Sequence, residues 1–513
     1  MTMFQWFLFF LIIQVVHFIG TWKLYVKAGR KSWEAIVPIY NAIVLMKIIN
    51  RPTWWVILLF IPIINLLMFP VIWIETIRSF GKNSTIDSFL AVLTLGFYTY
   101  YINYLSDANY IEDRSLQSRT ELGEWVSSIV FAIVAATLVH TYFMQPYTIP
   151  TSSLEKSLLV GDFLFVSKFH YGARAPMTTI AAPMVHDSLP FVGTKSYLKK
   201  PQLPYFRIPG FENIKRNEIV VFNWPTDTVR FFRDQSRIHI DKPIDKKSNY
   251  VKRCVGIPGD SLEIKDGYIY INGDRTQLPD RAKPQYFNTV TAKEGFNPNS
   301  LITRYGSTEL GGGNNGIYTV NLTDANAKKL KNNPYVKSVV KDIFPKGNYD
   351  SSVFPHSEQY AWSRDNFGPI YIPEEGKTVE LNAASIPLYK RIIGEYEKNN
   401  VTVNGDEIYI NGKLATSYTF KQNYYWMMGD NRHNSEDARF WGYVPFDHVV
   451  GKPVFIWFSW NSNGKGLAEK IRWERVFTTV HGSGKPVSYL YYFLGALVIW
   501  FGFSSYRKRK KLE

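Results

Sequence analysis

The sequence predicts two fold classes in one chain: membrane-spanning α-helices that flank a large, mostly β domain. Long apolar runs without charged residues lie near both ends of the 513-residue chain. A helix needs about 20 such residues to cross a hydrocarbon layer of about 30 Å. Between these runs, short stretches of Val, Ile, Phe and Tyr alternate with turn residues, which is typical of β-strands. The length of the chain allows roughly three domains.

The apolar runs predicted to span a membrane are residues 3–22, 54–74, 88–105, 125–143 and 487–505. The run at 88–105 is the weakest, because it is short and contains Thr94, Tyr98 and Thr99. The alternative for that run is a helix at the membrane interface. Core helices of a soluble protein rarely lack charge over so many turns, which disfavours a soluble protein. Basic residues follow the first run instead of preceding it, so we expect an anchor and not a cleaved signal peptide.

The basic residues predict the side of the membrane on which each loop lies, because Lys and Arg in short loops mark the cytoplasmic side. The loops at residues 23–51 and 107–124 are expected inside, whereas the loop with Arg78 and Lys82 is expected outside. The tail at residues 507–511 is the densest basic cluster and is also expected inside. Residues 144–485 are therefore predicted to lie on the outer face.

Charge and cysteine content narrow the set of partners. The formal net charge of +16 favours an anionic partner, either nucleic acid or a membrane surface. Much of the basic excess falls in the predicted cytoplasmic loops and tail, so we expect membrane lipid as a partner and no nucleic acid. The single cysteine, Cys254, excludes an intramolecular disulfide and a Cys-x-x-Cys metal site. We expect no metal and no other cofactor.

The middle of the chain is predicted to form strands at residues 163–166, 219–222, 268–271, 407–410 and 454–457. Asn272-Gly273, Asn404-Gly405 and Asn411-Gly412 predict hairpin turns, because Asn-Gly readily adopts the positive φ of a type I′ turn. Residues 274–400, rich in Asn, Lys and Gly, indicate an inserted subdomain. The predicted domains are a membrane segment of about three spans (1–109), a linker and anchor (110–144), the β-rich domain (145–485), and a helix with a basic tail (486–513).

Three stretches of the β-rich domain contain residue types that could carry out catalysis. Residues 145–168, directly after the fourth apolar run, place Ser153 in a serine cluster behind a proline. Residues 250–260 place Lys252 among apolar neighbours before a Pro-Gly-Asp turn. Residues 428–439 read Met-Gly-Asp-Asn-Arg-His-Asn-Ser-Glu-Asp-Ala-Arg. Taken singly, the serine is typical of a turn and the lysine of a solvated strand.

In this order behind a membrane anchor, the three stretches resemble bacterial type I signal peptidase, the membrane-bound serine protease that removes signal peptides from exported proteins. The resemblance covers residues 143–168, 217–273 and 424–460. It implies that Ser153 is the nucleophile and Lys252 its general base. Thr151 stands where the family has a hydroxyl that helps the Ser153 amide to form the oxyanion hole. Ser435 stands where a hydroxyl orients the lysine.

The resemblance also implies bracing and substrate-binding residues. Asp437 and Arg439 match the acidic and basic residues that brace the third stretch. The positions that bind the residues preceding the cleavage site correspond to Tyr147, Ile149, Pro150, Leu154, Tyr250 and Val251.

The sequence departs from the family pattern at several positions: Leu154 replaces a methionine, Lys156-Ser157 a Pro-Thr pair, His433 an aspartate and Ala438 a serine. Leucine conserves the volume of methionine, so we expect that pocket to survive. A histidine near a nucleophile suggests a Ser-His alternative, although the family position that His433 occupies is not catalytic. The three N-terminal runs exceed the one or two anchors usual in the family.

The chemistry of the residues agrees with the resemblance. A serine hydroxyl needs a base that takes its proton, and histidine and neutral lysine are the two plausible bases. The pKa of lysine is near 10.4 in water, so burial must lower it to roughly 8 for a lysine to act near neutral pH. Tyr250, Val251 and Val255 flank Lys252 and provide apolar surface for such burial.

The function implied is signal peptidase I activity on exported preproteins, at the outer (periplasmic) face of the bacterial inner membrane, in a multi-pass protein. Small residues at the first and third positions before the cut are expected. The peptide would bind by strand addition. The secretion translocon is a further expected partner. Two alternatives are a Ser-Lys protease that cleaves itself and a non-catalytic membrane assembly or binding protein.

Overall fold

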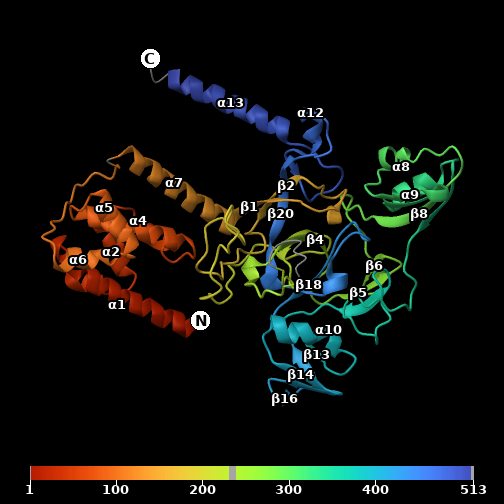
Figure 1. The fold of residues 1–513 in the computed structure, drawn as a ribbon, viewed down its shortest axis with the longest axis horizontal. Helices are drawn as coiled ribbons and strands as arrows, with labels where there is room; N and C mark the ends of the chain where they lie inside the picture. Colours follow the sequence, from red (N-terminus) through yellow and green to blue (C-terminus); the bar gives the residue numbers. More distant parts are fainter. Residues whose placement is uncertain (1, 119, 230–237, 510–513) are drawn as a thin grey trace. The chain divides into compact units, whose positions relative to one another are not determined.

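The computed structural model describes residues 2–118, 120–229 and 238–509. It separates into two compact units (Figure 1). The first contains Met1–Phe143, Ala173–Ile208 and Thr228–Lys247, and the second contains Met144–Gly172, Pro209–Asp227 and Ser248–Glu513. Two segments of the predicted β-rich region, at 173–208 and 228–247, thus group with the N-terminal helices. The domain boundaries given above remain predictions.

The first unit is built from helices. They are α1 (Met3–Lys27), α2 (Tyr40–Ile48), α3 (Trp55–Leu58), α4 (Ile64–Ser79), α5 (Thr85–Leu93), α6 (Tyr98–Tyr104) and α7 (Glu121–Leu138), which continues as a π-helical turn at Val139–Phe143. Within the part of the chain that the structure describes, two helices are long and apolar enough to cross a membrane: Met3–Lys27 and Glu121–Phe143. They coincide with the first and fourth apolar runs.

The second and third apolar runs do not form the continuous helices expected of single spans. Residues 54–74 are divided between α3 and α4, with Pro62 between them and Ile63 at a φ of 70°. Proline lacks the N–H that a helix interior requires, and its ring clashes with the preceding turn. Residues 88–105 are divided between α5 and α6, with Leu95 and Gly96 at positive φ. Each run therefore turns back on itself.

Side-chain contacts bring the residues before and after the 54–74 run close together. The buried carboxylate of Glu75 accepts hydrogen bonds from Arg51 Nε (2.9 Å), Arg78 Nη1 (3.3 Å) and Arg114. Arg51 precedes the run and Arg78 follows it, so the run cannot carry the chain from one face of a membrane to the other. The predicted location of Arg78 and Lys82 on the face opposite to Arg51 is therefore wrong. Hydropathy alone could not detect the turn that brings these residues together.

The second unit is centred on an eight-stranded sheet. Seven strands follow the order β1-β2-β20-β3-β4-β18-β19, and β21 pairs with β20. Their bounds are β1 (Met144–Thr148), β2 (Asp162–Ser167), β3 (Ile219–Asn223), β4 (Asn249–Gly256), β18 (Tyr424–Met428), β19 (Val444–Pro445), β20 (Val449–Ser459) and β21 (Thr478–Thr479). Strands distant in sequence thus become neighbours, which brings the three candidate catalytic stretches together.

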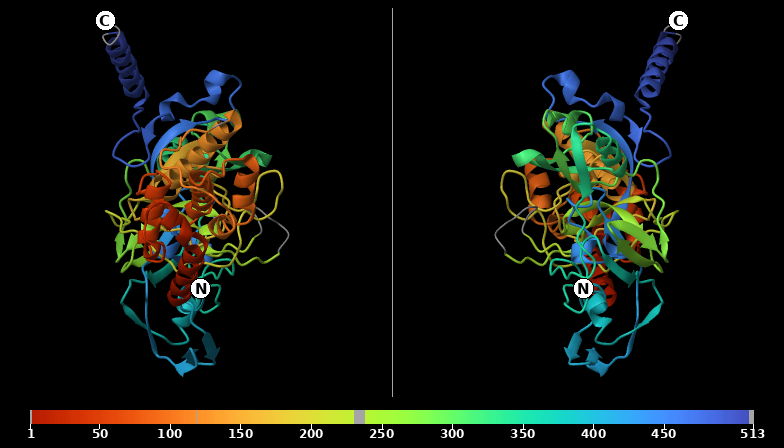
Figure 2. Two further views of the ribbon diagram at one scale, coloured as in Figure 1. Left: turned by 90° about the vertical axis from the view of Figure 1, so that its left-hand side faces the viewer. Right: turned by 90° about the vertical axis from the view of Figure 1, so that its right-hand side faces the viewer.

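Smaller sheets complete this unit. Strand β12 (Phe367–Tyr371) joins β5 (Ser261–Lys265), β6 (Tyr268–Ile271) and β7 (Asp274–Arg275). A two-stranded sheet pairs β13 (Thr378–Glu380) with β17 (Ser417–Thr419). A three-stranded sheet contains β14 (Val401–Asn404), β15 (Glu407–Ile410) and β16 (Lys413–Leu414), and it can be followed in the side views of Figure 2. The short helices are α10 (Ile386–Arg391), α11 (Ala438–Trp441) and α12 (Leu467–Lys470).

Part of residues 274–400 forms a compact subdomain, drawn in green in Figure 1. Its sheet has the order β11-β8-β10-β9, from β8 (Tyr286–Ala292), β9 (Leu310–Gly312), β10 (Ile317–Leu322) and β11 (Val336–Lys341). Helices α8 (Asn299–Thr303) and α9 (Asp324–Lys331) belong to the same subdomain, and Leu301 and Leu330 share a buried cluster with Val290 and Val320. Residues after β11 return to the other sheets through β12 and β13.

The five strands predicted from the sequence are confirmed as β2, β3, β6, β15 and part of β20. Asn272-Gly273 and Asn411-Gly412 link antiparallel neighbours with positive φ at both residues, as a type I′ turn requires. The Asn404-Gly405 hairpin is confirmed too, although of these two residues only Gly405 has a positive φ. Helix α13 (Leu490–Arg509) contains residues 490–505 of the fifth apolar run, and residues 487–489 of that run precede the helix. Lys510 and Lys511 of the basic tail fall outside the described residues.

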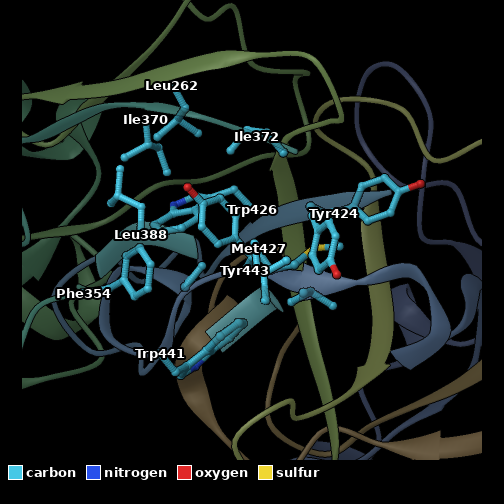
Figure 3. Close-up of a cluster of buried hydrophobic side chains, with 14 of the residues drawn as sticks. Leu262, Phe354, Ile370, Ile372, Leu388, Tyr424, Trp426, Met427, Trp441 and Tyr443 are labelled. Carbon is cyan, nitrogen blue, oxygen red and sulfur yellow. The ribbon is translucent and has the colours of Figure 1, made fainter. Parts of the chain in front are cut away.

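The main core of the second unit combines aliphatic side chains with a group of packed aromatic rings (Figure 3). Trp426 on β18 is fully buried and meets Tyr443 edge to face, with ring centroids 5.3 Å apart. Phe354 packs against both rings, at 5.9 Å from Trp426 and 5.5 Å from Tyr443. Edge-to-face pairs of this kind stabilise beyond their buried area. This packing fixes β18, after which residues 429–439 begin.

Candidate active site

Ser153 and Lys252 meet although 99 residues separate them. Ser153 lies in a single 3-10 turn, Ser152–Leu154, and Lys252 lies in the middle of β4. The Ser153 Oγ and the Lys252 Nζ are hydrogen-bonded at 2.7 Å, and both side chains are buried. Antiparallel pairing of Lys252 with Val220 on β3 fixes the register of the lysine in the sheet. The structure thus brings into contact the two residues that the sequence pairs as candidate nucleophile and candidate base.

The environment of Lys252 shifts its protonation equilibrium toward the neutral amine. Burial lowers the pKa of its ammonium from 10.5 to about 8, while Asp437 and Glu436 act in the opposite direction. The Nζ lies 5.2 Å from the centroid of the Tyr250 ring, and Tyr250 in turn stacks on Trp224. A neutral amine at 2.7 Å from a hydroxyl can accept its proton as the oxygen attacks. The site can therefore generate a serine nucleophile without histidine.

Asp437 and Arg439, the predicted bracing residues, form an ion pair in the loop after β18. The Asp437 carboxylate accepts from Arg439 Nε at 2.8 Å and Nη2 at 2.9 Å, and from the Gly429 N–H at 3.0 Å. Burial would raise the pKa of this carboxyl, but the ion pair with Arg439 and these hydrogen bonds outweigh burial and lower it. The pair and the Gly429 hydrogen bond join the two ends of the loop at residues 429–439.

A second buried ion pair supports the site, and the sequence did not predict it. Arg253, next to Lys252 on β4, donates to Asp430 from Nε at 2.8 Å and from Nη2 at 2.5 Å. The Ser157 Oγ donates to the same carboxylate at 2.5 Å. Arg253 is 3% exposed and Asp430 is fully buried. Because strand residues alternate in direction, the residue after the base holds the loop after β18 from the other face of the sheet.

Ser435 and Thr151, the two other hydroxyl residues expected at the site, lie near Ser153. The Ser435 Oγ is buried and makes no hydrogen bond in the described residues, so the predicted orienting contact with Lys252 is not formed. A Cβ placed on Gly429 would lie 2.2 Å from that Oγ and 2.6 Å from the Ser153 carbonyl, so Ser435 does lie close to the nucleophile. Thr151 immediately precedes the turn that carries Ser153.

His433 is not available to act as the base. Its Nδ1 accepts a hydrogen bond from the Phe287 N–H at 3.0 Å, so Nδ1 carries no proton. Its Nε2 therefore carries the proton and donates it to Asp365 Oδ1 at 2.9 Å. Both ring nitrogens thus bond groups from residues 274–400, and the ring is buried. The Ser-His alternative has no geometric support.

The residues expected to bind substrate are grouped near Ser153. Ile149 and Leu154 are buried in one apolar cluster, against which Tyr147 and Val251 pack. Tyr147 belongs to β1, which precedes Ser153, and Tyr250 and Val251 belong to β4, directly before Lys252. Pro150 is exposed and stands between β1 and the Ser153 turn. Within the described residues, His, Cys, Asp and Glu side chains do not gather in groups of three or more that could hold a metal ion.

Comparison with known proteins bears on this geometry. The family model "Signal peptidase, peptidase S26" matches residues 122–307 and 414–460, which include all three catalytic stretches. This chain belongs to the signal peptidase family. Signal peptidase I of Helicobacter pylori (strain ATCC 700392 / 26695) is 27% identical over 70% of this chain and 94% of its own length. Signal peptidase I of Buchnera aphidicola from Acyrthosiphon pisum is 25% identical over 76% of this chain and 97% of its own length.

The signal peptidase match leaves the N-terminal region unexplained. Residues 33–113 match a separate model, "Family of unknown function (DUF5684)". Signal peptidase I of Haemophilus influenzae is 22% identical over 72% of this chain and 79% of its own length. The chain is thus a signal peptidase with an additional N-terminal region, as the number of apolar runs predicted.

Proposed function

We propose that this chain is a signal peptidase I that removes N-terminal signal peptides from exported preproteins, with Ser153 as nucleophile and Lys252 as general base. The observation that carries the proposal is the 2.7 Å contact between the Ser153 Oγ and a buried lysine whose pKa is lowered to about 8. The family match and the names of the relatives support the same reaction.

The reaction follows from the dyad. Neutral Lys252 takes the proton of the Ser153 hydroxyl as the oxygen attacks the scissile carbonyl, and it then donates that proton to the departing amine. We assign the oxyanion hole to the Ser153 amide, assisted by the Thr151 hydroxyl, and a positioning role to Ser435. The acyl-enzyme formed on Ser153 is then hydrolysed by water, with Lys252 again accepting a proton.

The substrate must reach Ser153 as an extended chain. The apolar cluster that contains Ile149 and Leu154 supports a pocket for small side chains before the cut, with Tyr147, Pro150, Tyr250 and Val251 around it. Ser153 follows the end of the Glu121–Phe143 helix by ten residues, so the site would work near a membrane surface. A tethered preprotein and membrane lipid are therefore the proposed partners, and the translocon is a further one.

Incubation of the detergent-purified full chain with a preprotein bearing an A-x-A site tests this function. We expect one cut directly after the second small residue, and no cut when both small residues are replaced by large ones. A self-cleaving protease would process its own chain and leave the preprotein intact. A non-catalytic membrane protein would leave both intact, and either result would contradict the proposal.

We further propose a topology with the catalytic domain outside and the basic loops inside. Two crossings, by Met3–Lys27 inward and by Glu121–Phe143 outward, give this orientation while the intervening runs turn back. The contacts of Glu75 with Arg51 and Arg78 support the same side for the loops that contain those arginines. The location proposed is the bacterial inner membrane.

Cysteine labelling distinguishes this topology from five separate spans. In a Cys254→Ser background, a cysteine at Lys31 or Lys82 should be shielded from an impermeant thiol reagent in intact cells, and one at Asn314 should react. Lys31 should be shielded because it follows the inward crossing by Met3–Lys27. Lys82 should be shielded because it follows the 54–74 run, which turns back to the inner side. Reaction at Lys82 together with shielding at Lys31 would instead support a complete crossing by residues 54–74.

A further inference from the structure

Residues 274–400, whose role the sequence does not reveal, contact both loops that form the active site. The Lys156 Nζ, three residues after the nucleophile, donates to the Gly306 carbonyl. On the other loop, the Glu309 Oε1 accepts from Asn431 Nδ2 at 3.1 Å and from Asn434 Nδ2 at 2.5 Å. The inserted region is thus packed against the site, because its residues bind the loop that carries Ser153 and the loop after β18.

One residue of this region, Gln285, makes the central contacts. Its side chain is fully buried just before β8. The Gln285 N–H donates to the Asp430 carbonyl at 2.8 Å, and its own carbonyl accepts from the Arg432 N–H at 2.9 Å. The side-chain Nε2 donates to the Glu155 carbonyl at 2.9 Å, while Oε1 accepts from Asn321 Nδ2 at 3.3 Å. A single residue therefore joins three parts of the chain: its backbone binds the loop after β18, and its side chain binds the nucleophile loop and Asn321 of the insert.

These contacts hold the backbone of Ser153 on two sides. The Asn431 N–H, between the two residues that Gln285 pairs with, donates to the Ser153 carbonyl at 3.0 Å. The Glu155 carbonyl, two residues after Ser153, is held by the Gln285 side chain. Neither contact involves the hydroxyl or the amine of the dyad, so Gln285 acts on the reaction only through the position of Ser153.

We propose that Gln285 is a positioning residue through which the inserted region sets the place of the Ser153 hydroxyl relative to Lys252. This inference rests on the proposed function, because it concerns the rate of that reaction. A displacement of about 1 Å can lower the rate of a positioned reaction by roughly 100-fold, so a single buried amide at this place can control kcat. Through Gln285, the inserted region thereby helps to position the nucleophile.

Two substitutions of similar size test the proposal. Gln285→Met removes the donor to Glu155, and we expect kcat on the preprotein to fall by about 10- to 100-fold with KM changed less than about threefold. Gln285→Glu can still donate to that carbonyl when its carboxyl is protonated, and burial favours the protonated form. The activity of Gln285→Glu relative to wild type should therefore fall as pH rises from about 6 to 9. Gln277→Met and Gln277→Glu, at an exposed glutamine of the same region, are the matched controls and should behave as wild type.

The outcomes separate this inference from the proposed function. Cleavage by wild type with unchanged kcat in both Gln285 variants would refute the positioning role and leave the function intact. A raised KM at constant kcat would also refute it, because Gln285 would then affect binding alone. Equal losses in both variants at every pH, in step with a lowered Tm, would indicate a merely structural role. An inactive wild type would refute the function itself.

Discussion

Replacing Lys252 by alanine should lower kcat/KM for preprotein cleavage by about 10²- to 10⁴-fold, the usual contribution of a general base. Ser153→Ala should lose at least as much, because no other hydroxyl is hydrogen-bonded to the Lys252 amine in the described residues. The two residues act as one unit, so the double variant should be no worse than the more damaged single variant. Lys252→Arg and Lys252→His should not restore activity.

The Lys252 variant has a suitable control. Lys265→Ala removes an exposed strand lysine that pairs with Glu263 at 2.7 Å, and it should leave turnover unchanged. Single-turnover cleavage by detergent-purified protein, with near-UV circular dichroism as a check on folding, is the measurement. Retention of more than about a tenth of wild-type activity by folded Lys252→Ala would contradict the role of this base.

Breaking the Asp437 and Arg439 pair should have the largest effect on stability. Asp437→Ala leaves a guanidinium that is 1% exposed without its carboxylate, and it also removes the acceptor of the Gly429 N–H. Loss of one partner of a buried pair costs about 3–5 kcal/mol. We expect that decrease in the free energy of unfolding, measured by denaturant titration of the purified chain, together with loss of cleavage.

A double variant shows whether the cost comes from the unpaired charge. Asp437→Ala/Arg439→Met removes both charges, so it should be more stable than Asp437→Ala alone. Glu263→Ala, which breaks the more exposed pair with Lys265, should change the stability by less than about 1 kcal/mol. A double variant that is less stable than Asp437→Ala would show that Arg439 stabilises the loop by other means.

The elements that local patterns determine could be predicted from the sequence. The alternating stretches of the second unit became β2, β3 and β6, and Asn272-Gly273 became a turn with two positive φ values. The contact between Ser153 and Lys252 was also predictable, because the three stretches together resemble a known family, although neither residue is distinctive when taken singly. The stretches could not predict the distance between the Ser153 and Lys252 side chains, because that distance depends on the order of strands in the sheet.

The features that depend on long-range contacts could not be predicted. Arg253 and Asp430 are 177 residues apart, and although both lie in the candidate catalytic stretches, neither stretch indicates that these two residues pair. The role of His433 depends on Phe287 and Asp365, both in a region that the sequence leaves without a function. The second apolar run was predicted to cross the membrane because hydropathy counts apolar residues and ignores the break at Pro62. In each case a partner distant in sequence or a change of backbone direction decides the structure.

The pH dependence of kcat/KM tests most directly whether a buried, neutral lysine is the base. The pKa of Lys252 is lowered to about 8, so the active neutral form is depleted below that pH and dominates above it. We expect kcat/KM for a preprotein substrate to rise along a limb centred near pH 8, with the optimum above neutrality. A histidine base would give a limb near 6.5. A limb near 6.5 that disappears in His433→Ala would contradict the lysine mechanism.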